Sequence, residues 1–439
     1  MTFETAMEKL GTLQRFGSPG AVERVDWILE QFGNPQHQLQ FIHVAGTNGK
    51  GSTCAMLSSI LREAGYQTGL FVSPYIIEFR ERIQVNGEMI PKEAFAALME
   101  QVFPYVEQLQ SSGERMSEFE LVTVLAILWF SKQKCDIVVF EVGVGGKRDS
   151  TNVITNVLVS VLTSVSMDHT EVLGDTLEKI TTDKCGIMKP NGTFVVAPCQ
   201  KAEVMPIVKE EAEKKDNCVI EAFMNDIQLL HTDLNGTDFL YHGSTLHLPL
   251  IGVHQSLNVC TVLAVTEQLK QKGFSIEINH IKAGLEKVQF PARWEIVRKH
   301  PLIIIDGAHN QDGIDMLKAS VKQYLPNRTI VAVIGALRDK DTDYMVHALA
   351  DVFHHVITIT PNNPRALDAK TFALRWIACG QQTTAADDID DAISRAEQLI
   401  GENGVILVCG SLFVAAEARE KIKYHFMEND NNNKQNHCF

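Results

Sequence analysis

The sequence predicts an α/β fold in two domains. The first is a large domain built on a parallel sheet with a small antiparallel β appendage, and the second is a smaller α/β domain. Short apolar segments alternate with helix-like segments through the first half of the chain, as in a parallel sheet with right-handed crossovers. A hairpin pattern interrupts the alternation near residue 225, and the alternation restarts after Phe290-Pro291.

The composition is that of an ordinary globular protein with enough chain for two or three domains. Of its 439 residues, 45% are hydrophobic and 21% are charged. The net charge of −14 disfavours a nucleic-acid partner, because phosphate backbones attract cationic surfaces. No apolar run reaches the roughly 18 residues of a membrane helix, no secretory signal is present, and the nine cysteines form no CxxC motif. We therefore expect a cytoplasmic protein with reduced thiols and no membrane partner.

Four buried strands are expected in the first domain, at residues 41–45, 68–72, 136–142 and 157–163. After the first strand, apolar residues at helical spacing predict a helix that runs from Ser52 and is closed by Gly65. Ser117 and Glu120 form a capping box at the start of another helix. Because strands alternate with helices, we expect the carboxyl ends of the strands to share one crevice.

The antiparallel appendage is predicted from two strand-like segments, 226–234 and 238–241, that flank the turn sequence Asn235-Gly236. Residues 245–250 are expected to add a third strand. A helix through residues 258–271 follows.

The second domain is predicted to contain strands at residues 302–305, 329–334, 355–360 and 405–409, with helices between them. We expect the domains to span residues 1–295 and 296–427. Residues 428–439 are rich in Asn and are expected to be a disordered tail, because they cannot bury enough apolar surface to order themselves.

The strongest functional signal is the glycine-rich segment 46–53, between a predicted strand and a predicted helix. Its glycines let backbone N–H groups approach phosphate oxygens, the helix N-terminus adds positive potential, and Lys50 supplies charge. The segment departs from the common G-x-x-x-x-G-K-[ST] form, because Val44 replaces the first glycine and Gly51 separates Lys50 from Ser52. A simple glycine-rich turn is the alternative, and the strand–helix context favours phosphate binding.

Ser73, Glu141 and His169 stand where other predicted strands of this domain end. A phosphate loop, a hydroxyl, a carboxylate and an imidazole would thus share one crevice, where a Mg²⁺ ion beside ATP needs few protein ligands. Singly, each residue has an ordinary structural alternative, such as a turn at Ser73-Pro74. The glycines at 143–146 allow close approach of a ligand or form a tight turn.

From composition alone, Lys184 is predicted to be an ordinary exposed lysine on a helix. In the second domain, Asp306 and His309 follow a predicted strand. Asp306 is a candidate for binding ribose hydroxyls, and His309 for acid–base chemistry or charge stabilisation. The alternative is a helix N-cap at Asn310 and nothing more.

Ten motifs, in order along residues 15–425, resemble those of the folylpolyglutamate synthase / dihydrofolate synthase family, a branch of the Mur ligase superfamily. They are the phosphate loop, Ser73-Pro74, 79–83, 117–120, 141–146, 167–170, 183–187, 254–258, 292–295 and 306–310. The resemblance implies a phosphate-loop ATPase domain with a folate site, followed by a glutamate-ligase domain.

The resemblance also implies roles for individual residues. Those implied to bind ATP are Asn48, Gly49, Lys50, Gly51, Ser52, Asn258, Arg293 and Asp306. Those implied to hold two Mg²⁺ ions are Ser73, Glu141 and His169. Those implied to line the folate site are Ser117, Glu118, Phe119, Glu120, Arg148, Asp149 and Ser150. Lys184 matches a lysine that is carbamylated in the family, and His309 is implied to lie near the acyl-transfer centre, so Lys50, Lys184 and His309 form the implied catalytic set.

The implied reaction is ATP-dependent addition of L-glutamate to folate through an acyl phosphate, with ATP, folate and L-glutamate as the small-molecule substrates of a monomer. Dihydrofolate synthesis from dihydropteroate is a second implied activity. The sequence departs from the family at Ala292, at Lys147-Arg148 and at 17–20, where bifunctional members often carry an Ile-Asp-Leu-like stretch. From 17–20 we expect a reduced folate that already carries glutamate to be a better acceptor than dihydropteroate.

Two other functions are alternatives. A UDP-muramyl amino acid ligase of the same superfamily shares the phosphate loop, but only 45 residues precede Gly46 here, too few for the additional domain that such enzymes carry. A non-catalytic, nucleotide-gated binding protein would keep a phosphate loop, but it has no need for Glu141, His169 and Lys184 together.

Overall fold

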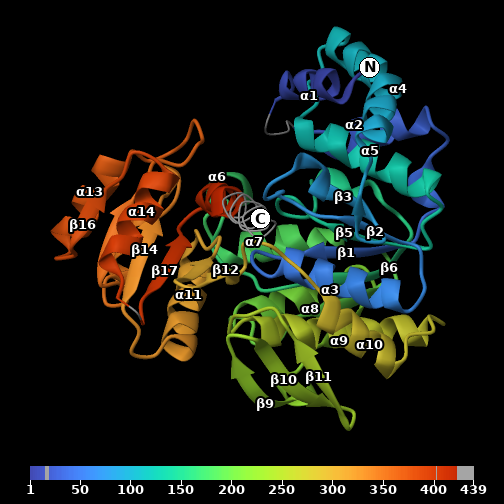
Figure 1. The fold of residues 1–439 in the computed structure, drawn as a ribbon. Helices are drawn as coiled ribbons and strands as arrows, with labels where there is room; N and C mark the ends of the chain where they lie inside the picture. The colour runs from blue at the N-terminus through green and yellow to red at the C-terminus, as the bar shows by residue number, and fades with distance from the viewer. Residues whose placement is uncertain (15–18, 402, 423–439) are drawn as a thin grey trace, which may run out of the picture. The chain divides into compact units, whose positions relative to one another are not determined.

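The computed structural model describes residues 1–14, 19–401 and 403–422 (Figure 1). These form two compact units. The first comprises residues 1–231, 237–249 and 255–289, and the second comprises 232–236, 250–254 and the described chain from 290 onward. The expected tail at 428–439, and Gly17 and Ser18 of the segment at 17–20, lie outside the described residues. The domain limits at 295 and 427 stay predictions.

The first unit is built on an eight-stranded sheet of order β4-β3-β2-β5-β1-β6-β7-β8. Its strands are β1 (Phe41–Ala45), β2 (Thr68–Phe71), β3 (Ile83–Val85), β4 (Glu88–Met89), β5 (Ile137–Glu141), β6 (Val157–Leu162), β7 (Thr193–Val196) and β8 (Cys218–Glu221). The six strands from β2 to β8 in this order pair in parallel, and β3 and β4 add an antiparallel edge. The predicted parallel sheet is therefore confirmed, and its four predicted strands are the central ones.

Helices cover both faces of this sheet (Figure 1). They are α1 (Phe3–Gly11), α2 (Ala21–Glu30), α3 (Lys50–Glu63), α4 (Lys92–Ser111), α5 (Glu118–Lys132), α6 (Thr170–Leu173), α7 (Leu177–Lys184), α8 (Val204–Glu213), α9 (Gln255–Gln271) and α10 (Ile278–Lys287). The helices α1, α2, α4 and α5 share one core with the aromatic face of the central strands, while α3 and α9 pack on the opposite face. The helix α3 ends as predicted, with Gly65 at φ +88° after the C-cap.

The helix α5 is more buried than its sequence pattern predicts. The apolar residues at helical spacing suggest one buried stripe, but every residue from 120 to 130 is buried. The reason is its location between α2, α4 and the 3₁₀ helix η3 (Ser150–Val153). The capping box forms only in part: Glu120 N donates to Ser117 Oγ, but the Glu120 carboxylate turns towards Arg24 of α2.

The predicted antiparallel appendage is a three-stranded sheet of order β11-β10-β9. Its strands are β9 (Gln228–Asp233), β10 (Gly236–Tyr241) and β11 (Ser244–Leu248). The pairing of Tyr241 with Ser244 sets the register of the β10–β11 hairpin. The segments predicted as a hairpin plus a third strand are thereby confirmed.

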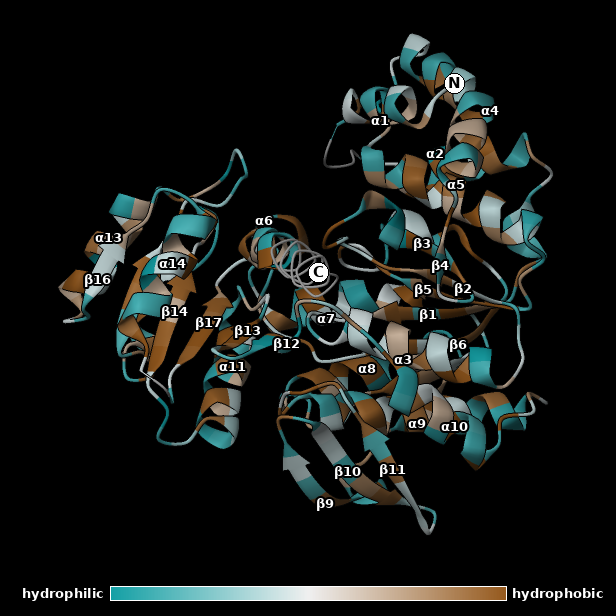
Figure 2. Cartoon of the chain, in the orientation of Figure 1, coloured by the Kyte–Doolittle hydropathy of each residue, from teal (hydrophilic) through white to brown (hydrophobic). Residues whose placement is uncertain are grey.

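The second unit has a six-stranded sheet of order β12-β13-β17-β14-β15-β16. Its strands are β12 (Glu295–Lys299), β13 (Leu302–Ile305), β14 (Ile330–Ile334), β15 (His355–Thr358), β16 (Thr383–Ala385) and β17 (Val405–Cys409), and its helices include α11 (Gln311–Tyr324), α12 (Thr342–Leu349), α13 (Ala369–Ala378) and α14 (Ile389–Leu399). Figure 2 shows β14 and β17 mostly in brown, as expected of strands buried on both faces. The antiparallel edge strand β12 was not predicted.

Within the described residues, no helix combines the length and the apolar character needed to cross a lipid bilayer. The eight cysteines in these residues are all free thiols.

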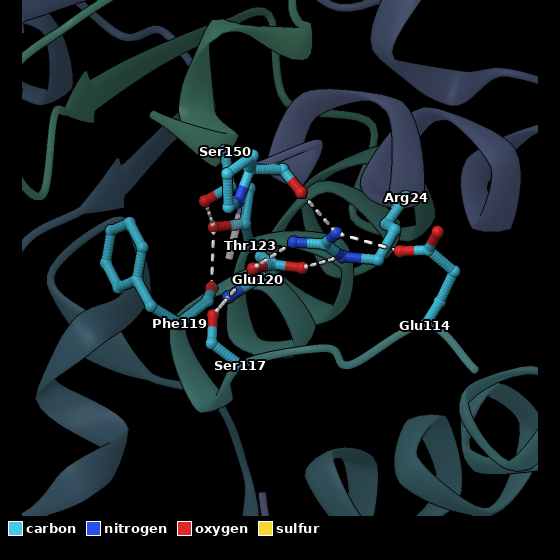
Figure 3. Close-up of polar contacts among 8 residues, drawn as sticks. Arg24, Glu114, Ser117, Phe119, Glu120, Thr123 and Ser150 are labelled. Carbon is cyan, nitrogen blue, oxygen red and sulfur yellow. Dashed lines mark hydrogen bonds and ion pairs between the residues drawn. The ribbon is translucent and has the colours of Figure 1, made fainter. Parts of the chain in front are cut away.

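A buried ion pair joins α2 to the start of α5 (Figure 3). Arg24 and Glu120 are 4% and 1% exposed, and the guanidinium donates from Nε and Nη2 to the two carboxylate oxygens at 2.8 and 3.0 Å. Ser117 Oγ donates to Glu120 Oε1 at 3.0 Å, and Arg24 Nη1 donates to Pro19 O at 2.8 Å and to Glu114 at 3.1 Å. The pair therefore fixes the N-terminus of α5 against α2 and against the backbone at Pro19.

Replacing Arg24 with Ala should destabilise the first unit by about 3–5 kcal/mol, because Glu120 would remain as a buried charge without its cation. Urea unfolding followed by circular dichroism measures the change. The double variant Arg24→Met/Glu120→Leu should be less destabilised than Arg24→Ala, since it leaves no unpaired charge. Lys214→Ala, at an exposed ion pair, is the control and should leave unfolding almost unchanged. Equal effects of Arg24→Ala and Lys214→Ala would contradict the prediction.

Candidate active site

The phosphate-loop segment runs from the end of β1 into the first turn of α3. Gly46 has φ +152°, and Gly49, the N-cap of α3, has φ +86°. A Cβ atom on Gly46 would lie 1.8 Å from Thr163 Oγ1, and one on Gly49 would lie 2.4 Å from Asn258 Oδ1. Both positions therefore require glycine, for backbone conformation and for space. Backbone N–H groups at a helix N-terminus are suited to binding phosphate.

Hydrogen bonds from the segment that follows β6 hold the loop in this shape. Thr47 N donates to Ser164 O at 2.7 Å, and Thr47 Oγ1 donates to Ser166 O at 3.1 Å. Ser164 Oγ donates to Asn48 O at 3.2 Å. Because β6 is the neighbour of β1 in the sheet, the loop is preorganised by the adjacent strand.

Two lysine side chains converge on the carbonyl of Gly46. Lys50 Nζ donates to Gly46 O at 3.2 Å and to Thr47 O at 3.1 Å, and Lys184 Nζ donates to Gly46 O at 2.8 Å. Lys184 ends α7 and is 4% exposed. Burial, reinforced by the nearby charge of Lys50, lowers the pKa of Lys184 to about 7. Lys184 is thus a buried amine at the phosphate loop, and the interpretation from composition as an exposed helix lysine is wrong.

Asn258, on α9, lies against the loop at Gly49. Its Nδ2 donates to Gln255 Oε1 at 2.9 Å, and Gln255 Nε2 donates to Ser52 Oγ at 3.4 Å. The structure therefore brings Asn258 together with the loop residues for which nucleotide binding is predicted. A direct contact between Asn258 and the nucleotide stays a prediction.

Ser73 and Glu141 meet just beyond β2 and β5. Ser73 N donates to Glu141 Oε2 at 3.0 Å, and Glu141 is 3% exposed. His169 lies beyond β6, is exposed, and precedes α6 with φ +50°. The strands β2, β5, β1 and β6 are neighbours in this order, so all three residues follow strands that end at one edge. Among the described residues no cluster of three or more His, Cys, Asp or Glu is arranged to hold a metal ion, and the metal assignment stays a prediction.

An aromatic ring and a carboxylate meet over Gly143, two residues after Glu141. A Cβ atom on Gly143 would lie 2.6 Å from Phe119 Cε1 and 3.1 Å from Asp149 Oδ2. The Phe119 ring also contacts the Phe71 ring, with centroids 5.7 Å apart. An aromatic face beside a carboxylate suits a flat heteroaromatic ring that carries N–H donors. This arrangement brings together two of the residues predicted to line the folate site.

The Asp149 carboxylate is held by hydrogen bonds on both oxygens. Oδ2 accepts from Val144 N at 2.9 Å, and Oδ1 accepts from Thr151 N at 3.0 Å and from Thr151 Oγ1 at 2.5 Å. Asp149 is 8% exposed, and burial raises its pKa while these hydrogen bonds oppose the rise.

The other residues predicted for the folate site have different surroundings. The Ser117 and Glu120 side chains bond to each other and, through Glu120, to Arg24 (Figure 3). Ser150 Oγ shares a hydrogen bond of 2.9 Å with Thr123 Oγ1. These three side chains therefore support the site from inside the protein, and their contact with folate stays a prediction.

Glu118 and Arg148 lie closer to the surface. Glu118 pairs with Arg82 at 3.6 Å, and Arg82 also lies over the ring of Tyr75. The Arg148 side chain is 76% exposed, 3.9 Å from Asp183. Both side chains are at least partly exposed, and each assignment to the folate site stays a prediction.

In the second unit, Asp306, which follows β13, lies near Arg293, which precedes β12. The buried Asp306 carboxylate accepts from Trp294 N at 2.9 Å and from Ala308 N at 2.8 Å. Burial raises the pKa of Asp306, and the nearby Arg293 opposes the rise. His309 Nδ1 lies 2.8 Å from the Gly307 carbonyl. A carboxylate and an imidazole thus both follow β13, as the sequence predicts.

Two features refine the sequence interpretation of this cluster. Asn310 is the N-cap of α11 and accepts from Gly313 N at 2.9 Å, so the capping role considered for it is confirmed. Ala292 has φ +55°, a left-handed conformation that favours glycine. A glycine at this position would adopt the same conformation without the steric cost of the Ala292 side chain.

Sequence reasoning missed several residues that shape the site. The phosphate loop is contacted by three residues that follow β6: Thr163, Ser164 and Ser166. Their position directly after a predicted buried strand is the sequence signal that could have identified them. Arg24 and His43 were missed because they are far in sequence from their partners Glu120 and Thr151.

The chain matches two family models. The Mur ligase middle domain matches residues 44–266, and the Mur ligase glutamate ligase domain matches residues 292–412. The dihydrofolate synthase/folylpolyglutamate synthase of Bacillus subtilis is 36% identical over 423 residues, which cover 93% of this chain and 96% of that protein. The folylpolyglutamate synthase of Lacticaseibacillus casei is 33% identical, covering 96% of this chain and 99% of that protein.

Solved structures show the same likeness. The folylpolyglutamate synthase of Mycobacterium tuberculosis, complexed with ADP and AMPPCP, has a TM-score of 0.87 and 29% identity, covering 96% of this chain and 98% of that one. The FolC protein of E. coli, in complex with DHPP and ADP, has a TM-score of 0.83 and 29% identity, covering 97% and 98%. With the phosphate loop, the buried Lys184 and both Mur ligase domains in one chain, this protein belongs to the folylpolyglutamate synthase family of the Mur ligase superfamily.

Proposed function

We propose that this protein adds L-glutamate to folates in an ATP-dependent reaction. The observation that carries the proposal is the meeting of Phe119 and Asp149 over Gly143, beside a phosphate loop on the adjacent strand. A ring face and a carboxylate suit the pterin, while the loop suits the ATP phosphates. The relatives with the same family name share nearly the whole length of the chain.

The chemistry that fits this arrangement is activation of a carboxylate. A carboxylate is a poor electrophile, and transfer of the ATP γ-phosphoryl group converts it to an acyl phosphate with a good leaving group. Lys50, at the N-terminus of α3, would neutralise charge on the phosphoryl group during transfer. The α-amine of L-glutamate then attacks the acyl carbon, forming the amide and releasing phosphate.

The residues at the strand ends fit Mg²⁺. Glu141 is a nearly buried carboxylate bonded to the backbone of Ser73, and the Ser73 hydroxyl adds a second hard oxygen donor. Two Mg²⁺ ions held by Ser73, Glu141 and His169 are part of the proposal. When bound, such ions neutralise phosphate charge and orient the oxygens in transfer.

Lys184 is suited to carbamylation. CO₂ adds to a neutral amine, and burial holds the pKa of Lys184 at about 7, so a large fraction of the amine is neutral at physiological pH. The carbamate would place an anion beside Lys50, whose positive charge is the second cause of the lowered pKa. We include a carbamylated Lys184 in the proposed site.

In the second unit, Arg293 and Asp306 are proposed to contact the nucleotide, and His309 to act near the acyl-transfer centre. The support is that Arg293 lies near Asp306, whose buried carboxylate, oriented by two backbone donors, is suited to ribose hydroxyls. We also propose that the protein acts as a monomer in the cytoplasm and has no nucleic-acid partner.

The acceptor identifies the function. With saturating ATP, Mg²⁺ and L-glutamate, we expect tetrahydrofolate monoglutamate to support ADP release, dihydropteroate to support it with a lower kcat/KM, and UDP-muramyl substrates to support none. Coupled-enzyme detection of ADP measures all three. If only the muramyl substrate supports ADP release, the protein is a cell-wall ligase. If none of the three acceptors supports ADP release, the result favours a binding protein. A kcat/KM that favours dihydropteroate would overturn the interpretation of residues 17–20.

Lys50→Ala should reduce ATP turnover by about 10²–10³-fold or more while the protein stays folded. The physical reason is that Lys50 lies in the first turn of α3 and donates only to loop carbonyls, so its charge contributes little to folding. Steady-state ADP release gives the effect, and circular dichroism checks the fold. The exposed Lys132→Ala is the control with unchanged turnover. Undiminished turnover in Lys50→Ala would remove the loop from the mechanism.

Lys184 should carry a carbamate that is lost as the pH falls below about 7, because protonation removes the neutral amine that CO₂ attacks. With ¹³CO₂, NMR should show one carbamate signal that is absent in Lys184→Ala. Lys189→Met is the matched control, because Lys189 is also partly buried, with a pKa of about 8, yet donates to Asn152 away from the loop. A signal that survives in Lys184→Ala and disappears in Lys189→Met would contradict the assignment.

A further inference from the structure

A buried histidine on β1 lies behind the proposed pterin site. His43 is 0% exposed, and its Nε2 lies 2.9 Å from Thr151 Oγ1. Nothing in the proposed chemistry uses this side chain. A polar residue in the middle of a central strand is costly unless its hydrogen bonds are made, so its partner is informative.

The hydrogen positions in this contact follow from counting donors. Thr151 Oγ1 donates its one hydrogen to Asp149 Oδ1 at 2.5 Å, so it can only accept from His43. His43 must therefore carry a hydrogen on Nε2. Its Nδ1 is buried and makes no hydrogen bond, which is consistent with a bare nitrogen there. Burial, with the nearby Lys189, also holds the pKa of His43 well below its usual value, so the imidazole is neutral.

The result is a chain of two hydrogen bonds. His43 Nε2–H donates to the Thr151 hydroxyl, and the Thr151 hydroxyl donates to the Asp149 carboxylate. The chain uses Asp149 Oδ1, which also accepts from Thr151 N. The other carboxylate oxygen, Oδ2, accepts from Val144 N and lies next to Gly143, close to the Phe119 ring. Donors on Oδ1 favour the ionised carboxylate, which burial alone would disfavour. The chain thus fixes the rotamer of Asp149 and favours its ionised form against the effect of burial.

We propose that His43 is a positioning residue that acts through Thr151 to hold Asp149 as an ionised acceptor for the N–H donors of the pterin ring. This inference rests on the proposed function, because it takes Asp149 as the carboxylate that binds the pterin. His43 touches no substrate in this role. Its effect is on folate affinity, and it leaves nucleotide binding at the phosphate loop unchanged.

The test uses pairs of variants that remove or keep each hydrogen bond. Thr151→Val removes the hydroxyl at nearly constant volume, and Thr151→Ser keeps it. His43→Leu removes the imidazole, and His43→Gln keeps an N–H donor near the Nε2 position. Thr151→Val and His43→Leu should raise the Kd of tetrahydrofolate monoglutamate, measured by titration calorimetry, by about 10-fold, because a hydrogen bond to a buried charge is lost. Thr151→Ser and His43→Gln should recover most of the affinity.

Kinetics separate positioning from a loss of structure. For Thr151→Val, KM for the folate should rise while kcat and the Kd of ADP stay near those of the unchanged protein. Thr155→Val is the matched control, because Thr155 makes the same kind of hydrogen bond to His37 at 2.9 Å on the surface. It should leave folate affinity unchanged.

The outcomes distinguish this inference from the proposed function. If Asp149→Asn weakens folate binding but Thr151→Val and His43→Leu do not, the hydrogen-bond chain has no role and the inference is overturned. If the Ser and Gln variants lose as much affinity as the Val and Leu variants, packing is the cause and the inference is again overturned. If the unchanged protein binds no folate, or if Asp149→Asn binds it normally, the proposed pterin site itself fails.

Discussion

The carbonyl of Gly46 accepts hydrogen bonds from Lys50 and Lys184, and this shared acceptor organises the site. Burial lowers the pKa of Lys184 to about 7, and the charge of Lys50 at the same carbonyl reinforces the effect. Gly46 has φ +152°, and a Cβ atom there would lie 1.8 Å from Thr163 Oγ1, so only glycine fits at this point of the loop. The two amines at this carbonyl set the electrostatics that a phosphate at this loop would meet.

The folate side depends on a second layer of buried polar contacts. Phe119 follows the helix start that Arg24 and Glu120 fix, and Asp149 is held by Thr151 and Val144. The two side chains come from separate elements and meet only because Gly143 has no Cβ. Hydrogen bonds and an ion pair thus fix the elements on both sides of Gly143, and such preorganisation reduces the entropy lost when a ligand binds.

Much of this architecture could be predicted from local patterns. The short apolar segments gave β1, β2, β5 and β6 within about a residue at each end, because a strand buried on both faces must be continuously apolar. Strand-end polar residues pointed to Ser73, Glu141, Asp306 and His309, since parallel strands end at one edge. The strands β3, β4, β7, β8, β12 and β16 were not predicted. Four of them, β4, β8, β12 and β16, are edge strands that pair on one side only and carry a weaker apolar pattern.

The sequence by itself determined the alternation of strands and helices, the glycine-rich loop between β1 and α3, and the family, because these depend on glycines, spacing and motifs that are local along the chain. Only the tertiary structure decided that Lys184 is buried at the phosphate loop, that Glu120 is neutralised by Arg24, and that His43 reaches Asp149 through Thr151. These contacts join residues up to 138 positions apart. The charge and protonation of such groups depend on burial and on distant partners, which are properties of the folded chain and not of any local pattern.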